Sequence, residues 1–299
     1  MNIYVETFIA GSIDELWDKT QQPELHQRWD LRFTEICYLP HTDQNLPQQF
    51  LYKTRIGFGL AISGEGETVG TRLSDHQRTS ALKFWSADPK SLIKAGSGYW
   101  KYEQGAKGVR FLTGYDYETR FGGVGHSFDR LIFRPLIGWA TAWSFDRLRL
   151  WIEEGIDPAV SLSNSLIHAF ARFTLVLIWL YQGLVPKLLF LHSDELAMMG
   201  ASSLPPALIP LAVRGFGLME VVFAFFLLVT WNRRWTLLVN LPLMILATLG
   251  VALTAPHYLI AAFNPVTLNG SVIVLALIGY LAGVNLPSAR RCIRQEKKS

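Results

Sequence analysis

Two ionisable residues, Arg214 and Glu220, lie inside an apolar run of this 299-residue chain that is long enough to cross a membrane as a helix. A charge at bilayer depth is costly unless it faces protein or water, so each of these residues is a candidate functional group. Six residues of helix separate them by about 9 Å along the axis and by roughly 120° around it. Because they do not face each other, each is expected to need a partner from a neighbouring helix.

The preceding apolar run and the loop after it supply polar partners for these two charges. We predict a membrane polar site formed by Tyr181, Gln182, Lys187, Glu195, Arg214 and Glu220. Such a site suits a polar headgroup, a quinone carbonyl or a proton. Two simpler interpretations stay open: a buried ion network can fix helix packing without any chemistry, and Lys187 can extend to the membrane surface.

Four apolar runs of this kind predict four membrane-spanning helices joined by short connections, which is an antiparallel four-helix bundle. The expected spans cover about 168–190, 206–231, 235–254 and 267–285. The composition shifts near residue 160, and no run of this length precedes it. The expected organisation is a soluble domain over 1–157, a linker over 158–165, a membrane domain over 166–286 and a basic cytoplasmic tail over 287–299.

Basic residues cluster in two places after residue 160, with Arg233 and Arg234 between the second and third spans and five more in the tail. Basic clusters beside spans mark the cytoplasmic side, so we expect an inner-membrane protein with both termini in the cytoplasm. A basic tail directly after a last span favours contact with lipid over nucleic acid. Cys37 and Cys292 are isolated, which excludes a disulfide framework and fits a reducing compartment.

The N-terminal half has the alternating pattern of a half-buried antiparallel sheet. A β-branched and aromatic run over 2–10 precedes Ser12 and Glu15, which form a capping box for a short helix, and a second short helix, PELHQRW, follows. The expected later strands lie over RFTEICYL and near 50–61, 67–73, 81–85, 98–103 and 109–119. One long helix is then expected from about 126 to 154, with Pro135 inside it.

This order of elements, together with the PELHQRWD segment, resembles the helix-grip fold of the START-related SRPBCC superfamily over roughly residues 1–155. The expected fold class is therefore an α+β helix-grip domain, with an antiparallel sheet and a long C-terminal helix, followed by an all-α four-helix transmembrane bundle. The resemblance implies a cavity between sheet and helix that holds a lipid or another apolar molecule. Its candidate lining is Phe111, Tyr115, Tyr117, Trp139 and Trp143, although the same aromatic residues can simply fill a core.

Three further patterns carry less weight. The stretch from Pro135 to Phe145 is apolar but too short to span, so it is buried under the sheet, lies at the membrane surface, or does both. The glycines of SGEGETVG lead into a strand, which favours a hairpin or bulge over a nucleotide-binding loop. His26, Asp30, Glu35 and His41 have no metal-ligand spacing, so no metal site is predicted.

The segments WLYQGLVPKLLFLHSDE and RGFGLMEVVFAF resemble the DoxX-like family of small four-helix membrane proteins over about residues 165–290. Some members of the wider grouping are similar to a subunit of thiosulfate:quinone oxidoreductase. The resemblance therefore implies a membrane domain and leaves the chemistry open.

Two functions are compatible with these features. In the first, the protein has no catalytic residues, its partners are membrane lipids and an apolar small molecule, and the bundle serves as an anchor and a site of ligand exchange. In the second, it is a subunit of a quinone-linked oxidoreductase. The chain has no haem, iron-sulfur or flavin motif, so no cofactor of its own is predicted, and the second function needs a quinone and a redox partner protein.

Overall fold

The computed structural model describes residues 2–40, 47–57 and 59–296. The chain forms two compact units, of which the first comprises Met1–Ser161 with Asn285–Ser299 and the second comprises Leu162–Val284. The segment after the last span is thus part of the same unit as the N-terminal half. Two residues of the expected tail, Lys297 and Lys298, lie outside the described residues.

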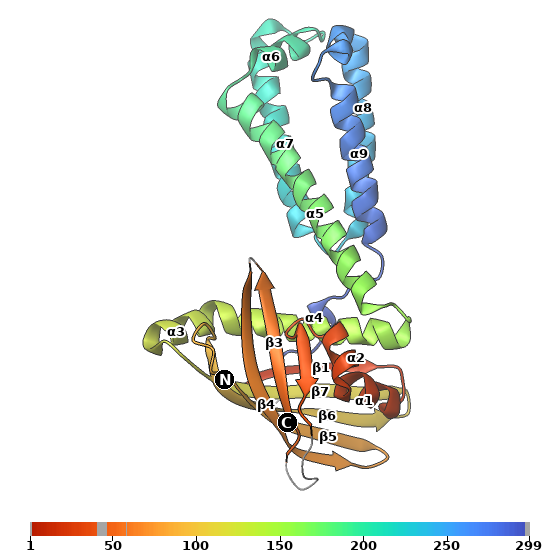
Figure 1. Cartoon of the computed structure of the whole chain (residues 1–299). Coiled ribbons are helices and arrows are strands. Elements are labelled where there is room, and N and C mark those ends of the chain that lie inside the picture. Colours follow the sequence, from red (N-terminus) through yellow and green to blue (C-terminus); the bar gives the residue numbers. More distant parts are fainter. Residues whose placement is uncertain (1, 41–46, 58, 297–299) are drawn as a thin grey trace. The chain divides into compact units, whose positions relative to one another are not determined.

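The first unit is built on a seven-stranded antiparallel sheet with the order β1-β7-β6-β5-β4-β3-β2 (Figure 1). Its strands are β1 (Ile3–Ile9), β2 (Glu35–Tyr38), β3 (Gln49–Gly57), β4 (Leu60–Leu73), β5 (Gln77–Trp85), β6 (Ile93–Gly105) and β7 (Gly108–Thr119). Neighbours in sequence pair from β2 to β7, and β1 pairs with β7. The predicted antiparallel sheet is confirmed.

The glycine-rich stretch corrects one expected strand boundary. The pattern predicts strands near 50–61 and 67–73, but β3 ends at Gly57 and β4 runs from Leu60 to Leu73 through Gly64 and Gly66. Glycine is tolerated there because aromatic rings of neighbouring strands lie against it, and a Cβ on Gly64 would come within 2.3 Å of the Tyr52 ring. The pairing shifts register between Thr68 and Gly70, so the expected bulge is present inside β4.

Helices flank the sheet in the order that the pattern predicts, with one correction. They are α1 (Ile13–Gln21), α2 (Pro23–Trp29), α3 (Gly122–Phe128), the π-helical turn η1 (Asp129–Phe133) and α4 (Arg134–Glu153). Ser12 caps α1 by accepting a hydrogen bond from the Glu15 N–H at 3.1 Å. The expected single helix around Pro135 is instead divided into α3, η1 and α4, and Pro135 lies in the first turn of α4.

Aromatic side chains fill the space between α4 and the face of the sheet that carries Phe111, which we call the inner face. Phe111 stacks on Tyr102 with ring centroids 4.9 Å apart and on Phe145 at 4.4 Å. Trp29 and Trp100 continue the cluster, and all five side chains are buried. Burying a large apolar side chain stabilises a fold by about 1.5–3 kcal/mol, so this cluster is a major source of stability.

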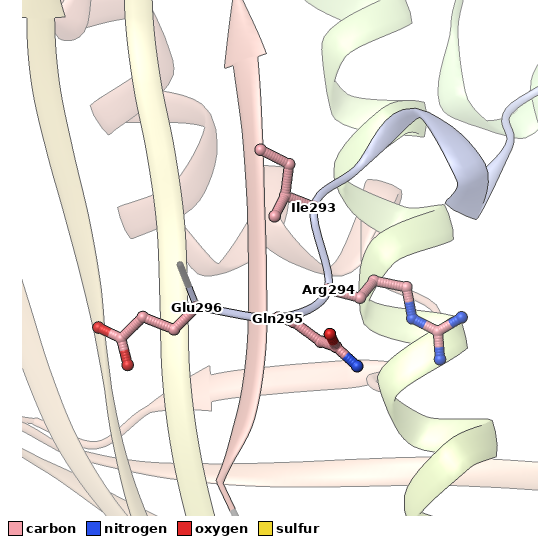
Figure 2. A pocket seen from close by; sticks show the side chains of 4 residues that line it. All are labelled: Ile293, Arg294, Gln295 and Glu296. Carbon is pink, nitrogen blue, oxygen red and sulfur yellow. The ribbon is translucent and has the colours of Figure 1, made fainter. Parts of the chain in front are cut away.

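The C-terminal segment packs on the first unit beside β1, as Figure 2 shows for residues Ile293 to Glu296. Ile293 and Glu6 exchange two backbone hydrogen bonds of 2.8 and 2.9 Å and form an antiparallel bridge. The fully buried carboxylate of Asp146 in α4 accepts the Ser288 N–H at 2.7 Å and a hydrogen bond from Arg291 at 3.2 Å. The tail is therefore held by both backbone and side-chain contacts.

The second unit contains four helical segments that are long and apolar enough to cross a membrane. They are Pro158–Leu189, Pro206–Val229, Arg234–Thr254 and Pro265–Ala282. In detail, they comprise α5 (Pro158–Gln182) with the π-helical segment η2 (Gly183–Leu189), η3 (Pro206–Leu208) with α7 (Ile209–Val229), η4 (Arg234–Val239) with α8 (Asn240–Thr254), and α9 (Pro265–Ala282). The short α6 (Ser193–Gly200) and η5 (Pro256–Ile260) lie in the connections, and η6 (Ala289–Arg291) lies in the tail.

The interior of the second unit is apolar with a few paired polar groups. Its buried cluster consists of Leu175, Val176, Trp179, Ala224, Leu227, Leu237, Met244, Val272 and Ala276. Trp179 of α5 donates a hydrogen bond of 2.7 Å to the Asn240 side chain at the start of α8. A hydrogen bond of this kind fixes the position of one helix relative to the other, because the surrounding apolar contacts have no directional preference.

Candidate functional site

Two glycines make the helix crossing on which the membrane polar site is built. A Cβ on Gly183 in η2 would lie 2.5 Å from the Gly217 carbonyl oxygen in α7, and a Cβ on Gly217 would lie 2.8 Å from the Gly183 oxygen. The two backbones are therefore in direct contact, which only small residues allow. Lys187 and Glu220 follow these glycines by about one turn and meet beyond the crossing.

Lys187 is the centre of this cluster. Its ammonium nitrogen lies 3.0 Å from Glu220 Oε2 and 3.2 Å from Glu195 Oε1 in α6. It also donates to the Gln182 carbonyl at 3.4 Å, an acceptor that Pro186 cannot satisfy because proline has no N–H. All three charged side chains are largely buried. One side chain thus links the first span, the second span and the loop between them.

The charges within this cluster do not balance. Two carboxylates face one ammonium group, so the fully ionised cluster carries one net negative charge. Glu220 Oε2 is buried and faces the Lys187 nitrogen at 3.0 Å. A group of this kind can take up a proton, or a cationic or hydrogen-bond-donating part of a ligand.

The structure brings together only part of the predicted membrane polar site. Lys187, Glu195 and Glu220 meet, whereas Gln182 takes part through its backbone carbonyl. Tyr181 is exposed on the outside of the second unit. Arg214 is also exposed and makes no hydrogen bond or ion pair with any residue of the described ranges. Glu220 thus meets a side chain of the first span, whereas Arg214 meets none among the described residues, and the membrane polar site stays a prediction.

One buried charged residue of α5, Arg172, was not anticipated. Arg172 is completely buried and donates to the carbonyls of Leu227, Thr230 and Arg233 at 2.7, 3.0 and 3.1 Å. It thereby caps the carboxyl end of α7, where helical carbonyls lack partners. The sequence did contain a signal for this role, because Arg172 is a charged residue inside the first expected span. The contacts assign Arg172 a structural role.

The aromatic residues proposed to line a cavity in the first unit are mostly packed. Phe111 has rings on both faces, Tyr115 donates to Thr141 at 2.8 Å, and Tyr117 donates to Asp129 at 2.6 Å. Trp143 is buried, with its ring 6.4 Å from that of Trp139, which is exposed. The prediction that these five residues contact a ligand stays a prediction.

A different part of the inner face is open and aromatic. A row of directly paired residues crosses six strands from β2 to β7 in the order Tyr38, Phe50, Gly66, Phe84, Gly96 and Tyr117. The Phe50 ring lies against Gly66 and the Phe84 ring against Gly96, because a Cβ there would approach those rings within 2.3 and 2.5 Å. Both phenylalanines are only partly buried. Within the row, Phe50 and Phe84 are therefore partly accessible rings, whereas Tyr117 is buried.

A polar cluster lies near this open row, in the turn after α2. Asp30 is buried and accepts hydrogen bonds from Arg32 at 2.6 to 3.2 Å, and its Oδ2 lies 3.1 Å from His26 Nε2. Burial alone would raise the pKa of Asp30, but the Arg32 charge and these hydrogen bonds hold it well below its usual range. Burial among Trp29, Phe33 and Trp100 lowers the pKa of His26.

No metal-binding group of three or more His, Cys, Asp or Glu side chains occurs within the described ranges. His41 lies outside those ranges, and Glu35 is exposed on β2. A hollow of about 390 Å³ lies between the tail and the outer face of the sheet, lined by Tyr4, Glu6, Tyr99, Lys101, Arg110, Leu112, Ile293 and Glu296. Arg110 pairs there with Glu6 and Glu103 at 2.7 Å, so its charge is already balanced.

Comparison with known proteins identifies the second unit. Residues 176–277 match the model of the DoxX-like family. The chain is also 50% identical over 183 residues to the uncharacterized membrane protein YndG of Bacillus subtilis (strain 168), a match covering 60% of this chain and 68% of YndG. The chain belongs to the family of this membrane protein and carries a DoxX-like domain. The Gly183–Gly217 crossing and the Lys187 cluster are therefore features of a DoxX-like domain.

Solved structures are similar to the other half of the chain. The di-domain aromatase/cyclase StfQ of the steffimycin pathway matches with a TM-score of 0.40 and 17% identity, over 52% of this chain and 50% of StfQ. The Zhui aromatase/cyclase of Streptomyces sp. R1128 matches with a TM-score of 0.39 and 12% identity, over 51% of this chain and 96% of Zhui. The chain thus spans half the length of StfQ. The helix-grip fold itself follows from the strand order and from α4 on the inner face.

Proposed function

We propose that this protein is a membrane-anchored binding protein whose first unit holds a lipid or another apolar molecule. The DoxX-like domain serves as the anchor and as a site where the ligand can be exchanged. The observation that carries this proposal is the row of partly exposed rings over glycines on the inner face, between Phe50 and Phe84. Sites for apolar ligands are lined mostly by aromatic and other apolar side chains.

The proposal is tested on the full chain purified in mild detergent, with mass spectrometry of the molecules that remain bound. Phe84→Glu places a charge in the row and is expected to reduce the bound lipid at least tenfold, since burying an unpaired carboxylate is costly. Lys83→Glu is the matched control, because Lys83 is the exposed neighbour on the opposite face of β5. Equal lipid content in the wild type and in Phe84→Glu would overturn the proposal.

The proposed location is the inner membrane, with both termini in the cytoplasm. The basic pair Arg233 and Arg234 between the second and third spans supports this orientation. The packing of the tail on the first unit supports it as well, because both ends of the chain then lie on one side of an even number of spans. Protease accessibility of the β6–β7 turn in inside-out and right-side-out vesicles tests it.

A second candidate function, a quinone-linked oxidoreductase subunit, is favoured only by the buried Lys187 cluster. Under this function Glu220 takes up the proton that accompanies quinone reduction, and the electrons come from a partner protein. Glu220→Gln keeps the size of the side chain and removes the proton site. Quinone-linked respiration that is unchanged in Glu220→Gln cells and in a deletion strain would exclude this function.

A further inference from the structure

The helical segment before the buried part of α4 carries an exposed apolar ridge. Its members are Val124, Phe128, Leu131, Ile132, Leu136 and Trp139, from α3, η1 and the first turns of α4. Val124 is 81% exposed and Leu131 is 74% exposed, values that are unusual for large apolar side chains in a folded domain. Further along α4, residues 141 to 148 are all buried. The ridge is thus confined to the first half of this helical layer.

The ridge is continuous because of its residue spacing. Val124, Phe128, Ile132, Leu136 and Trp139 follow each other at intervals of four, four, four and three residues. Four residues overshoot one turn of an α-helix, and the wider π-helical turn η1 takes up part of this drift. The apolar side chains therefore stay on one side of the rod, whereas Gly125 and Asp129 are buried on another.

The buried side of the same rod explains why the ridge faces outward. Asp129 accepts a hydrogen bond from Tyr117 of β7 and pairs with Arg134 at 2.8 Å. Arg134 also reaches Asp116 at 2.8 Å, and its guanidinium lies over the Tyr117 ring at 4.4 Å. These contacts hold one side of η1 on the sheet. Turning the ridge inward would break them, so its exposure is built into the fold.

The exposed charge on this segment is positive. Among residues 121 to 140 the single carboxylate, Asp129, is buried and paired, and the exposed ionic side chain is Arg130. An apolar helix face bordered by positive charge and a tryptophan is the pattern of helices that lie in the headgroup region of a bilayer.

The chain itself keeps the first unit close to a membrane. Only residues 154–157 separate the end of α4 from Pro158, where the helix that continues into the first span begins. Four residues extend at most about 14 Å, so the unit cannot move far from the bilayer that the chain crosses. A lipid surface is therefore always available to the ridge, at a high local concentration.

We propose that the ridge from Val124 to Trp139 lies in the headgroup region of the lipid bilayer and holds the first unit against the membrane. This contact positions the unit and is separate from ligand binding at the aromatic row. It adds to the attachment through the spans because each apolar side chain leaves water. The ridge is thus a membrane-contacting surface of the first unit.

The test uses the full chain in nanodiscs of phosphatidylcholine and phosphatidylglycerol, with single nitroxide labels. The background variant is Cys37→Ser, because Cys292 is buried and burial raises the pKa of its thiol to about 12, which prevents labelling. Labels are placed at Leu131→Cys on the ridge and at Lys83→Cys on the outer face of β5, both exposed positions where a label does not disturb the fold. The measurement is the collision rate of each label with oxygen and with a water-soluble nickel complex.

The proposal predicts opposite results at the two positions. The Leu131 label should collide more with oxygen, which concentrates in lipid, and the Lys83 label should collide more with the nickel complex. A Leu131 label as accessible to nickel as the Lys83 label would overturn the proposal. Dipolar broadening between ridge labels of two copies would also overturn it, because the ridge would then be a protein–protein interface.

Discussion

His26 makes the first unit sensitive to mild acid. Its ring is packed against Trp29 and Trp100, and burial lowers its pKa from 6.5. The unfolded chain therefore binds a proton more readily than the folded one, and the free energy of unfolding falls as the pH drops below about 6.5. Asp30 adds a second loss below about pH 3.8, since its folded pKa is depressed.

The prediction for His26 is a loss of thermal stability between pH 7.5 and pH 5.5, measured by tryptophan fluorescence of the full chain in detergent. His26→Gln should remove most of this pH dependence. His76→Gln is the control, because His76 is exposed in the β4–β5 turn, and it should behave like the wild type. An unchanged pH dependence in His26→Gln would contradict the assignment.

Arg172 and Arg214 are both arginines inside apolar helices, and they can be compared because their surroundings differ. Arg172 is buried and holds three carbonyls of α7 and the following turn, whereas Arg214 is exposed and makes no ion pair or hydrogen bond within the described ranges. Arg172→Leu leaves those carbonyls unsatisfied, and an unsatisfied buried group costs about 1–3 kcal/mol. We expect Arg172→Leu to lower the thermal midpoint in detergent clearly, and Arg214→Leu to leave it unchanged or to raise it. Equal effects of the two variants would contradict this reading.

At the scale of helices, the crossing of η2 and α7 requires glycine at position 217 of α7 but not at position 215. A Cβ at position 217 would come within 2.7 Å of Lys187 Cβ, whereas nothing lies within 4 Å of a Cβ at position 215. Gly217→Ala should therefore cost about 1–3 kcal/mol through overpacking, and Gly215→Ala should be neutral. Unfolding in graded denaturing detergent measures the difference, and similar midpoints for both variants would disprove the crossing.

The sequence pattern predicted elements better than it predicted contacts. The alternation along 109–119 was enough to place Phe111, Tyr115 and Tyr117 on the buried face of β7, because strand geometry has a fixed period of two. The Lys187–Glu220 pair needed the Gly183–Gly217 crossing, which depends on two helices at once. The exposure of Arg214 could not be foreseen either, since an apolar run all around a helix does not show which side meets other helices.

The π-helical turns η1 and η2 were likewise invisible in the sequence pattern. Each adds a residue to one helical turn, and each lies at a polar cluster, Asp129 with Arg134 in the first unit and Lys187 with Glu220 in the second. Turns of this kind are often found at functional positions. Pro135 lies in the first turn of α4, and Pro186 lies inside the widened turn η2.

At the scale of the whole molecule, the tail acts as the closing element of the first unit. Cys292 belongs to the tail and is buried, with its thiol donating to the Ala142 carbonyl at 3.2 Å, whereas Cys37 is exposed. A maleimide should therefore label Cys37 quickly and Cys292 very slowly at pH 7.5. Asp146→Ala removes the acceptor of the Ser288 N–H and should increase labelling of Cys292 at least tenfold, as measured by mass spectrometry.

The control for this experiment is Asp157→Ala, which removes an exposed pair with Arg28 and leaves the tail contacts intact. Labelling of Cys292 in this variant should match the wild type. Fast labelling of Cys292 in the unaltered protein would show that the tail is released in solution and would contradict the packing described here.

The position of the tail also bears on how the protein is made. The segment from Asn285 onward is synthesised only after all four spans, yet it supplies the partner of Glu6 in β1 and of Asp146 in α4. Until then β1 has an open edge, a position where strands of different chains can pair wrongly. The first unit therefore gains these contacts only after all four spans have been synthesised, so it is completed by a segment that lies beyond the whole membrane domain in the sequence.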